Sequence, residues 1–254
     1  QDSSSAASDV YKRQIYMFKE DKQNKIFGRR KGKNLSNLQK KNLNRYLKDF
    51  SIFSNDNDNI DKLKKINPYN LFHELKTKDI GLEIGFGMGD FLFDKALSCP
   101  KVGFIGCEIF ENGVASLLNR IIKFKISNLR IHFGNCLDLI YNLNLSTLNE
   151  IYVLFPDPWP KNKHKKRRFF NENNAFYLCS LLEKNGTINI ATDIDDYAAQ
   201  ILGIMEKKKN FDFINSNFFQ SEINNKIKFN TKYEKKAIDS GRNTNYFIFK
   251  KKYE

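Results

Sequence analysis

One stretch restricts the possible folds more than any other, residues 151–170, which reads IYVLFPDPWPKNKHKKRRFF. Its first five residues are apolar without alternation, the pattern of a central parallel strand that is covered on both faces. Pro156, Pro158 and Pro160 then end the strand, because proline cannot donate a hydrogen bond to a neighbouring strand. We therefore expect a fold of the α/β class, built around a buried parallel sheet.

Asp157 and Trp159 stand between these prolines, and Trp159 is the only tryptophan of the chain. Open α/β sheets bind ligands at the carboxyl ends of their strands, so both side chains are candidates for a site. We expect Trp159 to pack in the wall of that site, with stacking on a ligand as the open alternative. Six cations follow within the eight residues from Lys161 to Arg168, and such a run favours contact with a polyanion. A solvated turn before a charged helix start is the other interpretation.

A second candidate segment is a glycine-rich turn. An expected strand at 80–85 leads into Gly85, Gly87 and Gly89, and a helix should follow from about Phe91 to Ser98. Glycines let the backbone turn sharply and approach a ligand, and the helix start behind them offers free N–H groups. The pattern indicates a nucleotide-like cofactor. It does not separate dinucleotides from S-adenosylmethionine, although the dinucleotide fingerprint has a different glycine spacing.

Strands and helices alternate along the rest of the chain. Further strands are expected at 102–108, 129–134, 187–193, 211–219 and 245–252, and helices at 112–125, 171–184 and 196–208. This alternation implies a mostly parallel, doubly wound sheet. Acidic or amide side chains stand at or near the carboxyl ends of five strands: Glu83, Glu108, Asn135, Asp157 and Asp193. We therefore expect them along one edge of the sheet. Glu108 also has a spacing from the glycines, about twenty residues, that suits hydrogen bonds from ribose hydroxyls.

The N-terminal part of the chain is strongly basic. Residues 1–16 look like a fusion scar, a mis-called start or a disordered tail, and we expect 17–66 to form a basic arm and linker before a domain at 67–254. Between Lys12 and Lys48 there are 13 Lys and Arg but two acids, and the whole chain has a net charge of +14. This charge favours nucleic acid or another anionic surface as a partner, with a merely solubilising tail as the alternative for the arm.

The cysteine, histidine and hydropathy patterns restrict the cellular compartment, the metal content and the membrane association that we expect. The four cysteines form no CxxC pair, which favours a reduced, cytoplasmic protein. The three histidines have no metal-ligand spacing, so we expect no metal site. Apolar runs of membrane-spanning length do not occur in the sequence, so we expect no membrane partner.

At this point five segments of the chain together resemble the bacterial tRNA (guanine-N7-)-methyltransferases. They are FPDPWPK at 155–161 with its basic run, LEIGFGMGD at 82–90, GCE at 106–108, ATD at 191–193 and TKYE at 231–234. The resemblance covers most of the chain from about residue 26 onward. It implies a class I Rossmann-like methyltransferase with a doubly wound, mostly parallel sheet and an antiparallel closing strand. Two departures are the basic run, where relatives often carry paired histidines, and Asn135, which stands where an acid is common.

The resemblance also implies a cofactor, a substrate and roles for individual residues. The cofactor would be S-adenosylmethionine, with a site formed by Glu83, Gly85, Gly87, Glu108, Asn135 and Asp157. The substrate would be a guanine in the variable loop of tRNA, converted to 7-methylguanosine. Contacts to this nucleotide would come from Lys161, Asp193, Thr231, Lys232, Tyr233 and Glu234. Asp157 is the usual catalytic assignment.

The residues agree with this chemistry on independent grounds. N7 of guanine already has an in-plane lone pair, so no proton need leave before it attacks a methyl group. Alignment of the reactants then matters more than a strong base, and a Ser-His-Asp or Cys-His arrangement is not required. Asp157 or Asp193 could accept hydrogen bonds from N1–H and the amino group, which would select guanine over adenine.

Other functions stay open at the level of sequence. An amino-group methyltransferase acting on another base commonly carries Asp/Asn-Pro-Pro-Tyr/Trp, whereas the order here is Asp157-Pro158-Trp159-Pro160. A nicotinamide oxidoreductase is disfavoured by Asp90 and by the basic loop. A non-catalytic RNA-binding protein on a methyltransferase scaffold would not need the acids and glycines. The sequence leaves open whether the protein is a monomer or a homodimer, and which tRNAs it modifies.

Overall fold

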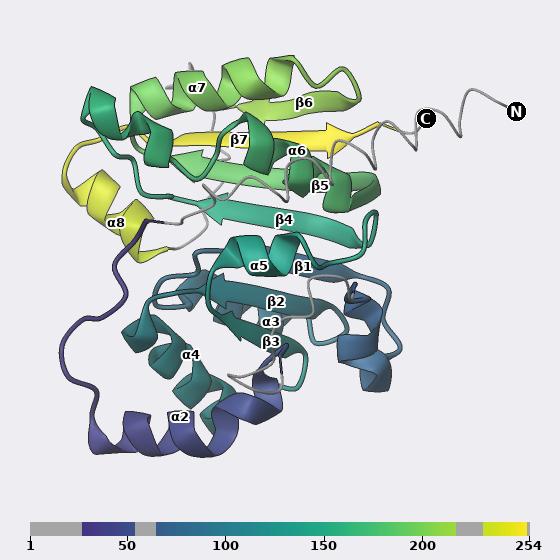
Figure 1. The fold of residues 1–254 in the computed structure, drawn as a ribbon, viewed down its shortest axis with the longest axis vertical. Coiled ribbons are helices and arrows are strands. Elements are labelled where there is room, and N and C mark those ends of the chain that lie inside the picture. Colours follow the sequence, from purple (N-terminus) through teal and green to yellow (C-terminus); the bar gives the residue numbers. More distant parts are fainter. Residues whose placement is uncertain (1–26, 54–64, 217–230, 253–254) are drawn as a thin grey trace, which may run out of the picture.

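The computed structural model describes residues 27–53, 65–216 and 231–252. A seven-stranded sheet forms its centre (Figure 1). The strands are β1 (Ile80–Ile84), β2 (Gly103–Glu108), β3 (Leu129–Phe133), β4 (Leu148–Leu154), β5 (Leu182–Thr192), β6 (Phe211–Ser216) and β7 (Asn245–Lys251). The helices are α2 (Asn37–Phe50), α3 (Asp90–Ser98), α4 (Glu111–Phe124), α5 (Cys136–Ile140), α6 (Glu172–Leu181), α7 (Asp195–Glu206) and α8 (Lys232–Asp239). Two short 3-10 helices are η1 (Pro68–Leu75) and η2 (Asn162–Arg167).

The order of the strands is β3-β2-β1-β4-β5-β7-β6, which confirms the doubly wound sheet. Strands β1 to β5 pair in parallel, and β7 is antiparallel to both β5 and β6. Figure 1 shows this reversal, since the arrow of β4 points toward α8 and the arrow of β7 points away from it. From β1 the chain continues to β2 and β3 on one side, and it then crosses to β4 on the other side of β1. The carboxyl end of β1 is therefore the switch point where such sheets bind ligands.

The strands are buried because helices cover both faces of the sheet. The residue pair Phe104 and Ile105 illustrates this, since neighbours along a strand point to opposite faces. Phe104 packs in a cluster with α3 and α4, whereas Ile105 packs in a second cluster with α5, α6 and α7. The continuous apolar run at 151–154 in β4 follows from this double cover, as the sequence predicted, whereas Phe155 lies just beyond the end of the strand.

Helix α2 lies against α4 and beside β3, at the lower edge of the molecule in Figure 1. Its Leu43, Leu47 and Phe50 pack against the α3–α4 cluster, and Ser36 begins the helix with a capping box. Helix α2 also carries four exposed cations: Lys40, Lys41, Arg45 and Lys48. The basic arm is therefore folded onto the sheet domain over this part of its length.

The boundary between α6 and β5 differs from the sequence-based expectation. We expected a helix at 171–184 and a strand from 187, but α6 ends at Leu181 and β5 begins at Leu182. Leu182 is fully buried and pairs with Leu148, so packing against β4 ends the helix early. Within the described ranges, none of the helices has both the length and the apolar character needed to cross a bilayer.

Candidate functional site

The predicted side chains at the strand ends lie along one edge of the sheet, in the order of the strands. From the β3 end to the β5 end, they are Asn135, Glu108, Glu83, Asp157 and Asp193. Beside them is a cavity of about 890 Å³, formed by the glycine turn, the turn after β4, the basic run and the start of α8. Of the five, Glu83, Glu108 and Asp157 line this cavity directly.

The glycine turn after β1 forms the base of the cavity. Gly85, Gly87 and Gly89 all have positive φ, at 73°, 55° and 76°, which only glycine adopts without strain. Helix α4 also approaches this turn closely, since a methyl carbon added at Gly113 would lie 1.9 Å from the carbonyl oxygen of Gly87. Arg120 of α4 donates to the carbonyl of Met88 and so fixes the same turn.

Glu108, at the end of β2, holds the glycine turn through its carboxylate. One oxygen accepts a hydrogen bond from the Gly87 amide at 2.7 Å. The other accepts from the amides of Ile109 and Phe110, at 2.7 and 2.9 Å, at the start of α4. Burial raises the pKa of Glu108, although these three amide donors act in the opposite direction. Glu108 therefore joins the glycine turn after β1 to the start of α4 at the cavity floor.

Glu83, in β1, is a buried acid without a full set of partners. Its side chain is 2% exposed, and the Oε2 atom has no hydrogen-bond partner within the described structure. Burial, and then the negative charges of Glu108 and Asp90, raise the pKa of Glu83 to about 8. A bound group that carries positive charge would favour the ionised form of this carboxyl group.

The electrostatics of the cavity indicate what kind of ligand fits. Five carboxyl groups line it: Glu83, Asp90, Glu108, Asp157 and Glu172. A ligand that combines a positive charge with hydroxyl or amino donors satisfies these acceptors. Cations also line the cavity, so a ligand that carries an anionic group as well finds partners there: Arg29, Lys166, Arg167, Arg168, Lys232 and Lys236. Among the described residues, no three His, Cys, Asp or Glu side chains are grouped in a way that could hold a metal ion.

The turn after β4 places Asp157 at the mouth of the cavity, where its side chain is exposed. Phe155 and Trp159 on either side have positive φ, at 51° and 40°, an unfavourable backbone for residues with a Cβ. Such strained residues persist only where surrounding contacts determine their conformation, and they gather at functional sites. Desolvation by the cavity walls raises the pKa of Asp157.

The basic run forms η2 and divides into two groups. Lys161 and Lys163 are exposed and do not line the cavity, whereas Lys166, Arg167 and Arg168 do. The guanidinium of Arg167 lies 5.0 Å from the ring centre of Trp159. Trp159 also lines the cavity, so its packing role stays a prediction beside stacking on a ligand. The expectation that all six cations are available to a polyanion was wrong for Arg168, which is 2% exposed. Its charge is used inside the protein.

The TKYE segment lies at the start of α8, and three of its four residues line the cavity. Thr231 is the N-cap of the helix, and it lines the cavity together with Lys232 and Tyr233. Glu234 does not line the cavity, because it is buried and accepts a hydrogen bond from the hydroxyl of Tyr246. We infer that Glu234 fixes α8 against β7.

Two further predicted residues are engaged with other side chains at the edge. Asp193 forms an ion pair with Arg242, with 2.5 Å between Oδ2 and a guanidinium nitrogen. Asn135 caps α5, where its side chain accepts from the Leu137 amide at 3.0 Å. It stands between two cavity-lining residues, Gly134 and Cys136, without lining the cavity itself.

Two parts of the cavity wall were not predicted: the start of α6 at 171–174, and residues 27–33, which we call the strap. Phe27, Gly28 and Arg29 line the cavity, and a Cβ added at Gly28 would lie 3.7 Å from Oδ2 of Asp157. Figure 1 shows the strap running from beside α8 toward α2. The sequence contained one signal, a Phe-Gly pair inside an otherwise basic arm.

The strap is fastened to the start of α4 and to the basic run. Asn112 accepts from the Gly32 amide and donates to the carbonyl of Lys33, both at 2.7 Å. The Glu111 amide donates to the carbonyl of Arg30 at 2.9 Å. At the other end, the guanidinium of Arg167 lies 4.8 Å from the ring centre of Phe27. The strap therefore covers the cavity in a defined position.

Comparisons with known proteins agree with this geometry. A family model described as a putative methyltransferase matches residues 77–246. The tRNA (guanine-N(7)-)-methyltransferase of Ruegeria sp. (strain TM1040) is 34% identical over 228 residues, which are 89% of this chain and 87% of that protein. The bifunctional methyltransferase of Rickettsia prowazekii (strain Madrid E) is 37% identical over 227 residues. These residues are 89% of this chain and 40% of that protein, so the chain spans less than half of that longer relative.

A solved structure supports the fold alone. The 16S rRNA methyltransferase KamB superimposes with a TM-score of 0.52 over 72% of this chain and 93% of that chain, at 11% sequence identity. At this identity the likeness extends to the arrangement of strands and helices, and it does not extend to the substrate.

Proposed function

Since the chain belongs to the tRNA (guanine-N(7)-)-methyltransferase family, we propose that it methylates N7 of a guanine in tRNA, with S-adenosylmethionine as its cofactor. When bound, this cofactor supplies an electrophilic methyl group on a sulfonium. A bond forms between N7 and the methyl carbon while the bond from that carbon to sulfur breaks, and S-adenosylhomocysteine leaves. No base is needed before the attack, so the chain's own residues bind and align the two reactants.

The observation that carries this proposal is the position of the carboxylate-lined cavity. It lies at the switch point of the sheet, its floor is the glycine turn, and cations of the basic run stand at its mouth. A cationic cofactor suits the carboxylates, and a polyanionic substrate suits the cations. The buried Oε2 of Glu83, which lacks a partner, supports a positively charged occupant.

We assign the cofactor side of the cavity to the residues that the structure brings together around the glycine turn. Gly85 and Gly87 let the backbone approach the cofactor, and Glu108 is placed to accept from ribose hydroxyls in addition to its amide donors. Glu83 balances positive charge. Asn135 contributes through the cap that fixes the first turn of α5, since its side-chain oxygen already accepts the Leu137 amide.

We assign the substrate side to the mouth of the cavity. Asp157 lies there on a fixed turn and can accept hydrogen bonds from N1–H and the amino group of guanine. Thr231, Lys232 and Tyr233 line the same side. Asp193 can reach a nucleotide only when its ion pair with Arg242 opens. Lys161, the exposed cations of the basic run and those of α2 would bind tRNA phosphates, with the variable loop at the mouth.

The four cysteines support a cytoplasmic setting for this reaction, since all four are free thiols.

The test is methylation of unmodified tRNA followed by nucleoside analysis. We expect 7-methylguanosine as the product. Cleavage of the tRNA strand at the modified base should locate it in the variable loop. Asp157→Asn keeps the shape of the side chain and removes its charge, so it should lower the single-turnover rate at saturating tRNA while tRNA binding is kept. A methyl group on an amino nitrogen would support a methyltransferase for another base. Cofactor binding without any methyl transfer would support a non-catalytic RNA-binding protein.

A further inference from the structure

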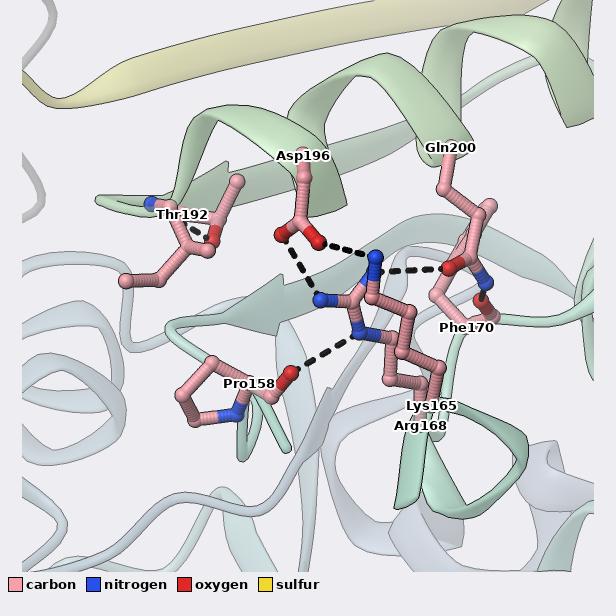
Figure 2. Close-up of polar contacts among 8 residues, drawn as sticks. Pro158, Lys165, Arg168, Phe170, Thr192, Asp196 and Gln200 are labelled. Carbon is pink, nitrogen blue, oxygen red and sulfur yellow. Dashed lines mark hydrogen bonds and ion pairs between the residues drawn. The ribbon is translucent and has the colours of Figure 1, made fainter. Parts of the chain in front are cut away.

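Arg168 is the last cation of the basic run, and the protein buries it completely. Its Nε donates to the carbonyl of Pro158 at 2.8 Å, and its terminal nitrogens donate to Gln200 at 2.9 Å and to Asp196 at 2.7 Å. Figure 2 shows the guanidinium between these three partners, two of which come from α7. Its carbon also lies 4.6 Å from the ring centre of Tyr197. The guanidinium is therefore held by protein groups on several sides, and Arg168 also forms part of the cavity wall.

The partners of Arg168 are themselves fixed, so the cluster is rigid. Lys165 forms a 2.7 Å ion pair with the second oxygen of Asp196. Gln200 donates to the carbonyl of Phe170 at 3.0 Å, and the hydroxyl of Tyr197 accepts from the Phe170 amide at 2.9 Å. The cluster thus joins α7 to both sides of η2.

One bond of this cluster reaches the site. Pro158 directly follows Asp157, and proline has no N–H, so its carbonyl is the only backbone group through which this residue can be held. The turn also contains two residues with positive φ, Phe155 and Trp159, whose conformation must be imposed by contacts. The hydrogen bond from the Arg168 guanidinium to the Pro158 carbonyl supplies such a contact.

We propose that Arg168 is a positioning residue for the methyl transfer, which holds the Asp157 turn in its productive conformation by anchoring the Pro158 carbonyl to Asp196 and Gln200 of α7. This inference rests on the function proposed above. It gives Arg168 a task that differs from that of the exposed cations of the run, Lys161, Lys163 and Lys166, which the proposed function assigns to RNA phosphates. Arg167 packs on Phe27 and Trp159, whereas the adjacent Arg168 holds the Pro158 carbonyl from the interior of the protein.

The experiment compares Arg168→Lys with Asp157→Asn and Lys163→Ala in single-turnover methylation across tRNA concentrations. Lysine keeps the charge and cannot contact Pro158, Asp196 and Gln200 together, so a displaced turn should lower the rate at saturating tRNA by roughly 10–100-fold. Lys163→Ala removes an exposed cation, and its effect should lie in the tRNA concentration at half-maximal rate and in its salt dependence. In the Asp157→Asn background, Arg168→Lys should cause little further loss, because both changes act through one carboxylate.

Two additional measurements keep the test decisive if Arg168→Lys folds poorly. Thermal unfolding of each variant shows how much folded protein is present, and rates are compared per folded molecule. Guanidinium ion, added below denaturing concentrations to Arg168→Ala, should restore part of the rate by occupying the vacated cluster.

The outcomes separate the possible roles. A normal saturating rate with a higher tRNA concentration at half-maximal rate would make Arg168 a phosphate contact. A lower unfolding temperature with a normal rate per folded molecule would make it purely structural. Either result overturns the proposal. If Asp157→Asn itself methylates at the wild-type rate, the role of Asp157 in the proposed function is wrong, whatever Arg168 does. If Asp157→Asn is slow and Arg168→Lys is normal, only the positioning role is lost.

Discussion

Glu83 should make the ligand-free protein less stable as the pH rises. Burial and the neighbouring acids raise its pKa from the ordinary 4.5 to about 8 in the folded chain. A carboxyl whose pKa is raised by folding contributes stability below its unfolded pKa, and that contribution is lost as the pH rises toward the folded value. The loss therefore occurs between the unfolded value of 4.5 and the folded value of about 8. Glu83→Gln cannot ionise, so this loss should be missing from the variant.

The size of the effect follows from the raised pKa. One pKa unit corresponds to about 1.4 kcal/mol, so the wild-type protein should lose roughly 3 kcal/mol of unfolding free energy between about pH 5 and about pH 8 through this group. The stability of Glu83→Gln relative to wild type should rise by the same amount over that range. Urea unfolding followed by circular dichroism, at several pH values and without ligand, measures this difference.

A matched control is Glu206→Gln, which removes an exposed carboxyl at the end of α7 and should follow the wild-type pH profile. Cofactor binding should depend on the ionised form of Glu83, whereas folding favours the protonated form, because an ionised Glu83 balances the sulfonium charge. Glu83→Gln should therefore bind S-adenosylmethionine more weakly, by ~1.5–3 kcal/mol in calorimetry, the range for a bond to a charged group. Parallel unfolding profiles for wild type and Glu83→Gln would refute the reasoning, since they would mean that Glu83 is not desolvated.

Three other changes test the remaining parts of the site. Gly113→Ala places a carbon 1.9 Å from the Gly87 carbonyl oxygen and should lower the unfolding free energy by ~1–3 kcal/mol, whereas Gly203→Ala in α7 meets open space and should raise it by about 0.4–1 kcal/mol in the same urea titration. Glu108→Ala should weaken S-adenosylmethionine binding by ~1.5–3 kcal/mol, and unchanged affinity in calorimetry would remove this residue from the site. Alanine at the exposed cations of α2 should raise the tRNA concentration for half-maximal rate and flatten its salt dependence, and an identical salt slope would mean that α2 does not touch RNA. These cations are Lys40, Lys41, Arg45 and Lys48.

Much of the fold could be predicted because its signals are local. Apolar runs such as 151–155 mark strands that are covered on both faces, and glycines or prolines mark where those strands end. Polar residues at the strand ends then had to share one edge, because parallel strands end on the same side. The start of β5 was missed because the pairing of Leu182 with Leu148 is a tertiary contact that overrides the Asn185-Gly186 signal.

The site was less predictable where residues of one kind have different environments. Nothing within the basic run distinguishes Arg168 from Arg167, because the burial of Arg168 depends on Asp196 and Gln200, which follow about thirty residues later in the sequence. Glu234 resembles a substrate contact in sequence, yet its environment is set by Tyr246 of β7. The strap was missed for the same reason, since its docking depends on Asn112 of α4.

The strap belongs at once to the cavity wall, through Gly28, and to the basic arm, through Arg30 and Lys31. Any ligand that requires the docked strap stabilises that position, whether it lies inside the cavity or on the outer surface of the arm. Thermodynamic linkage then makes the two binding events mutually reinforcing, and the factor by which one ligand tightens the other is the same in both directions. A cofactor in the cavity and an RNA on the arm can in this way favour each other across the strap without touching.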